Sequence, residues 1–214
     1  MVIDMTLETD YEILKKHYED CLARHGDTHL GVDWPKPDEA RLRHEIMWGL
    51  LASHKPATLL DVGCGLSHFY EFLLETPGAS QIQYSGLDIS PEFVNLSKKK
   101  YPENEYFCVD LIQDPNSMGT YDYLTLNGLF TQRRGMTPEA MRRFFERMLL
   151  AAFSKARVGL AFNVMSKQVD WEKEGSFHLS FDEVASFVTK NLSRKFVFRH
   201  DYGLYEFTTY VYRA

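Results

Sequence analysis

The stretch from Thr58 to Phe69 combines an apolar run, an acidic residue and two closely spaced glycines. The apolar run predicts a buried strand that ends at Asp61, and Gly63 and Gly65 then let the backbone turn sharply into a helix. Because glycine has no Cβ, a ligand can approach the main chain closely, and free N–H groups at the start of the helix point toward it. The pattern predicts a strand–turn–helix cradle for a nucleotide-like ligand.

The same turn separates two classes of nucleotide site. Dinucleotide-binding proteins place a third glycine where this chain has His68, and a bulky residue there opposes close packing of the helix on the strand. A nicotinamide-dependent oxidoreductase is therefore disfavoured. Ser67 is small and is predicted to cap the helix. The chain contains no Gly-x-Ser-x-Gly turn, so a serine hydrolase is not indicated either.

Two further carboxylates follow the next predicted strands. Ligands of parallel sheets bind beyond the carboxyl ends of the strands, and Asp88 and Asp110 stand at such ends. Asp88 could accept hydrogen bonds from both hydroxyls of a ribose, and Asp110 could accept one from an adenine amino group. Helix capping and turn formation are the alternative roles. Ile89 and Leu111 are apolar enough to sandwich an adenine, although core packing explains them almost as well.

The spacing Asp61-x-Gly63-x-Gly65, followed by Asp88 and Asp110, resembles that of the class I S-adenosylmethionine (SAM) methyltransferases. The resemblance extends from the first predicted strand to the end of the chain and implies SAM as the cofactor. It implies that Asp61 belongs to the cofactor turn and that Gly63 and Gly65 lie beneath the methionine part. It also implies that Asp88 binds the ribose and that Asp110 lies near the adenine.

Several shorter stretches narrow this resemblance. They are similar to a group of short bacterial methyltransferases that are often associated with surface-polysaccharide or other sugar modification. The stretches are 22–26 (Leu-Ala-Arg-His-Gly) with 31–34 (Gly-Val-Asp-Trp), 127–130 (Asn-Gly-Leu-Phe), 161–163 (Ala-Phe-Asn) and 200–207. The resemblance implies a sugar or nucleotide-sugar acceptor and a role in polysaccharide biosynthesis.

SAM carries a carboxylate and an ammonium group that need partners on the protein. Arg43, on a predicted helix, is the candidate for the carboxylate because a guanidinium offers two parallel donors, and Tyr18 is a second candidate. A surface arginine is the alternative interpretation of Arg43. Asn127, Asn163 and Ser166 fall at the ends of the fourth and fifth predicted strands. They could bind the ammonium group or the methyl acceptor; we assign Asn127 to the cofactor and the other two to the acceptor.

Methyl transfer to a hydroxyl requires removal of a proton, and a general base that titrates near neutral pH suits that step. Of the eight histidines, His200 is the candidate because it ends the sixth predicted strand beside Tyr202, Tyr205 and Glu206. These three residues, together with Trp34, are predicted to bind the acceptor. Capping of a turn is the alternative for His200. The other histidines show no metal-ligand spacing, so no metal site is predicted.

Strand and helix patterns alternate after residue 56 and supply the frame for these residues. Apolar runs predict strands at 58–62, 84–88, 106–110, 121–126, 158–164, 196–200 and 207–212, and apolar stripes predict helices at 137–155 and 180–191. The last two strands are joined by a short turn and must be antiparallel. The pattern indicates an α/β fold: a Rossmann-like, doubly wound, seven-stranded sheet with an antiparallel last strand.

Residues 1–56 precede the first strand and contain two predicted helices, at about 10–25 and 38–53. Thr9 or Asp10 is predicted to cap the first helix. We interpret residues 1–56 as a helical lid segment and 57–214 as the Rossmann-like core. Because 214 residues are too few for two comfortable domains, we expect a single domain.

Composition argues against several classes of partner. A net charge of −6 disfavours nucleic acid, whose phosphates need a basic surface. No stretch approaches the length of a membrane span, and the first ten residues lack the pattern of a signal peptide. Three widely spaced cysteines are typical of a reducing compartment. We therefore expect a cytoplasmic protein, and the sequence leaves the oligomeric state open.

The expected function is SAM-dependent O-methylation of a small polar acceptor, with a sugar or nucleotide-sugar hydroxyl as the first candidate. One alternative is N-methylation of an amino sugar or small amine, which shares every cofactor residue and needs less help from a base. The other alternative is a non-catalytic, SAM-binding regulatory or partner subunit.

Overall fold

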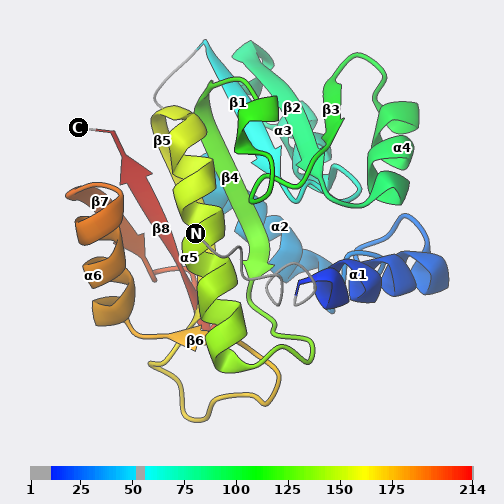
Figure 1. Cartoon of the computed structure of the whole chain (residues 1–214). Helices are drawn as coiled ribbons and strands as arrows, with labels where there is room; N and C mark the ends of the chain where they lie inside the picture. Colours follow the sequence, from blue (N-terminus) through cyan, green and yellow to red (C-terminus); the bar gives the residue numbers. More distant parts are fainter. Residues whose placement is uncertain (1–10, 52–55, 214) are drawn as a thin grey trace.

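The computed structural model describes residues 11–51 and 56–213, which form one twisted sheet with helices on both faces (Figure 1). The strands in this part of the chain are β1 (Ala57–Val62), β2 (Ile82–Asp88), β3 (Glu105–Cys108), β4 (Tyr121–Phe130), β5 (Ala156–Ser166), β6 (His178–Leu179), β7 (Lys195–Arg199) and β8 (Glu206–Tyr212). The helices are α1 (Glu12–His25), α2 (Pro37–Trp48), α3 (His68–Glu75), α4 (Pro91–Lys100), α5 (Pro138–Lys155) and α6 (Phe181–Asn191). Short 3-10 helices occupy Ala79–Gln81 and Pro115–Ser117.

The strands follow the order β3-β2-β1-β4-β5-β8-β7. Strands β1 to β5 are parallel to one another, and β8 lies antiparallel between β5 and β7. This topology confirms the predicted Rossmann-like sheet with an antiparallel last strand. The additional strand, β6, pairs with the end of β5 and was not predicted, since its two residues carry no periodicity.

The alternating side chains of the strands feed two hydrophobic layers, one on each face of the sheet. On β1, Leu59 packs into the layer formed with α2 and α3, whereas Leu60 packs into the layer formed with α5 and α6. Both leucines are fully buried. Helices cover both faces of the parallel strands, so the side chains on both faces are apolar. This explains the continuous apolar runs of the sequence.

Helix α1 lies across the carboxyl ends of the central strands, where the arrow of β4 points toward it (Figure 1). Tyr11, at its start, donates a hydrogen bond to Asp110 Oδ2 at 2.5 Å. Ser90, after β2, donates one to Glu19 Oε1 at 2.6 Å. The segment thus contacts the loops that follow β2 and β3. That residues 1–56 act as a lid stays a prediction.

One predicted helix cap, Ser67, differs from expectation, and other predicted helix ends fall outside the described residues. The predicted caps Thr9 and Asp10 lie outside the described residues, as does the predicted end of the second helix at Ser53. Ser67 precedes α3 with φ +61°, and its hydroxyl forms hydrogen bonds with the Ser97 and Tyr106 hydroxyls instead of capping the helix. Within the described ranges, no helix is long and apolar enough to cross a membrane.

Candidate active site

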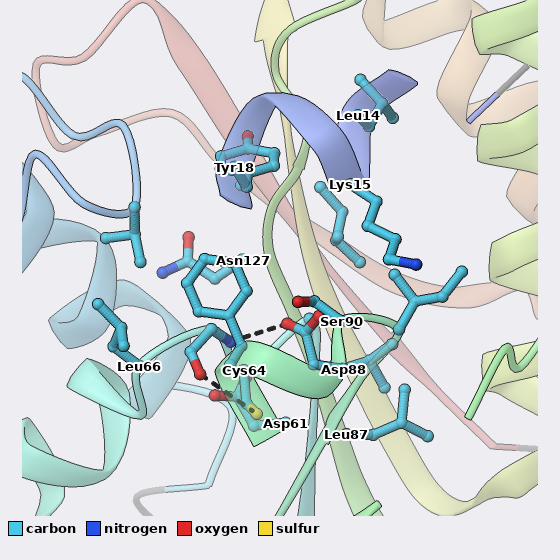
Figure 2. A pocket seen from close by; sticks show the side chains of 18 of the residues that line it. Leu14, Lys15, Tyr18, Asp61, Cys64, Leu66, Leu87, Asp88, Ser90 and Asn127 are labelled. Carbon is cyan, nitrogen blue, oxygen red and sulfur yellow. Dashed lines mark hydrogen bonds between the residues drawn. The ribbon is translucent and has the colours of Figure 1, made fainter. Parts of the chain in front are cut away.

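A cleft of about 1180 Å³, its open mouth included, lies at the carboxyl ends of the central strands. The turn after β1 and the ends of β2 and β4 form its floor, and α1, α2 and α5 contribute to its walls. Figure 2 shows Asp88 and Ser90 close to the glycine turn, with Tyr18 of α1 and Asn127 of β4 facing the same space.

The glycine turn is shaped as the sequence predicts. Gly63 and Gly65 have φ values of +74° and +51°, which favour glycine. A Cβ at Gly63 would come within 2.7 Å of the Leu129 side chain. The Gly65 N–H donates to Asp88 Oδ2 at 3.0 Å, and the Ser97 hydroxyl donates to the Gly65 carbonyl at 2.9 Å. The turn is therefore held by hydrogen bonds to Asp88 and Ser97, and both of its glycines line the cleft.

Asp88 combines the two roles that the sequence left open. It lines the cleft, and its Oδ1 accepts the Ser90 N–H at 2.9 Å while its Oδ2 holds Gly65. Burial raises the pKa of the Asp88 carboxyl above its ordinary value, whereas the backbone N–H groups lower it. Each carboxylate oxygen can still accept a second hydrogen bond, so the geometry is compatible with binding a diol.

Asp61 lies deeper beneath the turn. Its carboxylate accepts hydrogen bonds from Tyr84 Oη at 3.0 Å and from Thr125 Oγ1 at 2.8 Å. Burial raises the pKa of Asp61 to about 6. Asp61 therefore supports the floor of the cleft, and its hydroxyl partners tie β1 to β2 and β4.

The expected adenine end gathers residues from two loops. Ile89, Asp110 and Leu111 all line the cleft. Asp110 Oδ1 accepts the N–H groups of Ile112 and Gln113, so the predicted alternative role in a turn is present together with the position in the cleft. The phenol of Tyr11 already occupies Asp110 Oδ2, which any adenine amino group would share with it.

A buried polar network lies behind the cleft wall at Asn127. Asn163 Oδ1 accepts the Gly128 N–H at 2.7 Å, and Asn163 Nδ2 donates to Glu206 Oε1 at 2.8 Å and to Asn127 Oδ1 at 3.2 Å. Arg43 Nε donates to Glu206 Oε2 at 2.8 Å. Asn127 and Gly128 line the cleft, whereas Asn163, Glu206 and Arg43 do not.

The indole of Trp34 contacts both this network and the cleft. Its ring lies 4.3 Å from the Arg43 guanidinium carbon, a cation–π contact, and it also lines the cleft. Arg43 is thus held between Glu206 and Trp34. The predicted role of Arg43 as a clamp inside the cleft is not seen, because the guanidinium pairs with a buried carboxylate that sequence spacing could not reveal.

Residues 60–150 match the family model described as a methyltransferase domain. The matched part of the chain runs from β1 to α5.

The chain is similar to known proteins in both sequence and structure. A protein of Mycobacterium tuberculosis named as a putative methyltransferase is 26% identical over 164 residues, covering 74% of this chain and 95% of the relative. The magnesium protoporphyrin IX methyltransferase of Synechocystis, crystallised with S-adenosylhomocysteine (SAH), aligns with a TM-score of 0.63 and 14% identity over 99% of this chain and 100% of that one. An N1-methyltransferase of Burkholderia thailandensis, crystallised with 1,6-didemethyltoxoflavin and SAH, aligns with a TM-score of 0.58 and 16% identity over 95% of this chain and 90% of that one. These findings support a SAM-dependent methyltransferase, as the Asp-x-Gly-x-Gly turn predicted.

The residues of the last two strands do not reach the methyltransferase cleft. His200, the predicted general base, is exposed and packs against Phe181 and Phe207, with ring centroids 5.4 Å and 6.4 Å away. It is absent from the cleft lining, because the end of β7 lies two strands away from β5 at the edge of the sheet. The prediction that His200 faces the acceptor is therefore wrong for this structure.

The other predicted acceptor residues of this part of the chain also lie outside the cleft. Tyr202 Oη shares a hydrogen bond with Thr208 Oγ1 at 3.0 Å, and Tyr205 is 67% exposed. Ser166 is buried, and its hydroxyl accepts the Gln168 N–H at 3.0 Å. None of these residues lines the cleft; of the predicted acceptor residues, Trp34 does.

Two histidines that were not predicted as site residues, His44 and His68, line the cleft. His68 Nε2 pairs with Asp27 Oδ1 at 2.9 Å. His44, on α2, is 8% exposed and stacks near Phe69, and burial lowers its pKa to about 3. The His44 imidazole is therefore neutral at physiological pH and can accept or donate a hydrogen bond. No local signal marked it, since its position depends on how α2 packs against α3.

Two residues of α1 and one residue of the following loop bring together side chains that can bind metal ions. His17, Cys21 and Asp33 place one ligand atom each within 4.8 Å of one another. Arg134 pairs with Asp33, and Arg24 Nη2 donates to Cys21 Sγ at 3.3 Å. These two guanidinium groups already supply positive charge to the cluster. We therefore interpret the cluster as a set of polar contacts that join α1 to the neighbouring loops.

Proposed function

We propose that this chain transfers the methyl group of SAM to a hydroxyl of a small, uncharged acceptor bound in the same cleft. The observation that carries the proposal is that Gly63, Gly65 and Asp88 line the same cleft as Trp34 and His44. SAM, when bound, supplies an electrophilic methyl group on a sulfonium. The residues of the chain then have to hold the acceptor in line with it and keep water away.

The walls of the cleft support an acceptor without phosphate groups. Among the described residues that line it, Lys15 is the only lysine or arginine, and its Nζ lies 3.6 Å from Glu12 Oε2. A nucleotide-sugar would bring a diphosphate that needs cationic partners. Aromatic side chains instead contribute much of the surface: Tyr11, Tyr18, Trp34, Phe69, Phe93 and Phe144. A sugar hydroxyl without phosphate, or a phenolic hydroxyl, suits this surface better than a nucleotide-sugar does.

His44 is the group in the cleft that we expect to orient the hydroxyl of the acceptor. Its imidazole is neutral, and within the described residues neither ring nitrogen makes a hydrogen bond. A neutral imidazole can accept a hydrogen bond from an acceptor hydroxyl and so orient its oxygen. Because burial strongly lowers its pKa, His44 is suited to orienting the acceptor more than to holding its proton.

The second candidate function is N-methylation of a small amine. It is favoured by one feature of the cleft: among the described residues that line it, the imidazoles are those of His44, whose pKa burial lowers to about 3, and of His68, which already pairs with Asp27. A neutral amine attacks a methyl group without prior loss of a proton, so it would not need such a base.

The test is release of SAH from SAM with a panel of acceptors. The panel holds free sugars, nucleotide-sugars, simple phenols, amino sugars and small amines, with boiled protein as the control. We expect turnover with a free sugar or a phenol and little with nucleotide-sugars. Turnover confined to amines would select the second function. Binding of SAH without turnover on any acceptor would favour a non-catalytic, SAM-binding subunit.

A further inference from the structure

Asn163 is a fully buried side chain whose polar atoms are all committed. Its Oδ1 accepts the Gly128 N–H at 2.7 Å, and its Nδ2 donates to Glu206 Oε1 at 2.8 Å and to Asn127 Oδ1 at 3.2 Å. A backbone N–H can only donate, so the atom that faces it must be the amide oxygen. The orientation of the Asn163 amide is therefore fixed.

Glu206 fixes the same orientation of the Asn163 amide through its nitrogen. It is 1% exposed, and a carboxylate can only accept hydrogen bonds. Its Oε2 accepts from Arg43 Nε and Nη2, both at 2.8 Å, which leaves Oε1 for Asn163 Nδ2. Hydrogen bonds to an ionised group are stronger than neutral ones, so this end of the network is firmly anchored.

The consequence appears at Asn127, the one amide of the network that lines the cleft. Its Oδ1 receives the hydrogen bond from Asn163, so its Nδ2 points away from the network. Within residues 11–51 and 56–213, no group accepts a hydrogen bond from Asn127 Nδ2. A partly exposed amide with two free hydrogens therefore borders the cleft next to Gly128.

We propose that Asn127 donates a hydrogen bond from Nδ2 to the carboxylate of the cofactor's amino-acid part, and that Asn163 is the positioning residue that orients it. The inference rests on the proposed function, because it needs SAM or SAH in the cleft. It replaces Arg43, whose guanidinium is already paired with Glu206, as the partner of that carboxylate. The proposal also makes a carboxylate oxygen of the cofactor the partner of Asn127. From the sequence alone, the ammonium group of the cofactor was a possible partner.

Two adenosine compounds test the proposal by calorimetry. SAH carries the carboxylate, and 5′-deoxy-5′-methylthioadenosine lacks the whole amino-acid part. For Asn127→Ala we expect about a tenfold loss of SAH affinity, and for Asn127→Asp a larger loss, because a carboxylate there repels that of SAH. The affinity for methylthioadenosine should stay within about twofold of wild type for both variants. Asn116→Asp, on an exposed 3-10 helix, controls for the added charge.

Glu206→Gln tests the positioning role of the network. A glutamine offers one acceptor where the glutamate offers two, so either Arg43 or Asn163 Nδ2 loses its partner. We expect SAH affinity to fall severalfold while methylthioadenosine affinity is unchanged. A merely structural role would weaken both compounds together, which would overturn the positioning claim. Tighter SAH binding by Asn127→Asp would indicate an ammonium partner, and unchanged SAH binding would indicate none; either result overturns the proposal. Failure of the wild-type protein to bind SAH would instead count against the proposed function itself.

Discussion

The indole of Trp34 packs directly against the backbone of Gly128, so that a Cβ at position 128 would lie 2.7 Å from Trp34 Cζ2. Gly128 also has φ +84°, and its N–H is bound by Asn163. The register of β4 against β5 shifts between Leu126 and Phe130, where this contact is made. The position of Trp34 on the cleft wall therefore depends on a glycine that lies at an irregular point of β4.

Gly128→Ala is expected to destabilise the fold and to displace Trp34. The positive φ costs a non-glycine residue about 1–3 kcal/mol, and the contact with the indole adds to that cost. Gly175→Ala is the matched control, since Gly175 has φ +82° and no atom within 4 Å of its added Cβ. Urea unfolding should show a larger loss for Gly128→Ala than for Gly175→Ala. Equal losses would mean that the Trp34 contact adjusts at no cost.

Asp88→Asn is expected to lower both cofactor affinity and stability. An asparagine can accept from only one of the two N–H groups that Asp88 holds, those of Gly65 and Ser90. A buried donor left without a partner costs about 1–3 kcal/mol, and SAH affinity should fall at least tenfold. The measurements are urea unfolding and calorimetry, with Asp170→Asn, at an exposed loop position, as the control. Unchanged SAH affinity would reduce Asp88 to a support for the turn.

Asp61 predicts a specific pH dependence of stability. Burial raises its pKa from 3.8 to about 6 in the folded protein, so between these values the folded state binds more protons than the unfolded state. Stability attributable to Asp61 is therefore present at low pH and falls as the pH rises toward about 6, by up to about 3 kcal/mol. Relative to Asp61→Asn, the wild type should lose stability between about pH 4 and pH 6.

Chemical unfolding of both proteins across that range measures the difference. Carboxyls with the opposite shift do not disturb the comparison because both proteins contain them. Glu183 is one: burial alone would raise its pKa, but hydrogen bonds from Ser180 and Lys167 lower it to about 2. Parallel stability curves for the two proteins would contradict the assignment.

His44 and His200 form a matched pair for the acceptor side of the cleft. His44→Phe keeps a planar ring but removes both nitrogen atoms, and it should lower kcat/KM for the acceptor by about tenfold, the value of one hydrogen bond. His200→Phe should leave kcat/KM within about twofold, since His200 does not line the cleft. The assay uses the best acceptor from the panel. The reverse pattern would restore His200 as the base and would require the β7–β8 hairpin to move.

Local patterns were enough to predict the parts of the site that lie close together in sequence. The turn at Gly63 and Gly65 and the carboxylates at the ends of β2 and β3 follow from apolar runs and their stops, and all of them line the cleft. Arg43 was misplaced because its partner, Glu206, lies 163 positions away in the sequence. His200 was misplaced because strand direction predicts at which edge of the sheet a strand ends, but not how many strands separate that end from the cleft. Tyr11 and His44 were missed because helix packing, not spacing, brings them to the cleft.

The central claim is that the cleft above Gly63 and Gly65 binds SAM. Calorimetric titration of the purified protein with SAH, and separately with NAD, tests it most directly. We expect saturable binding of one SAH per chain and no detectable heat from NAD, because His68 occupies the position of the third glycine of dinucleotide sites. Absence of SAH binding by the folded protein, or tight binding of NAD in its place, would contradict the account.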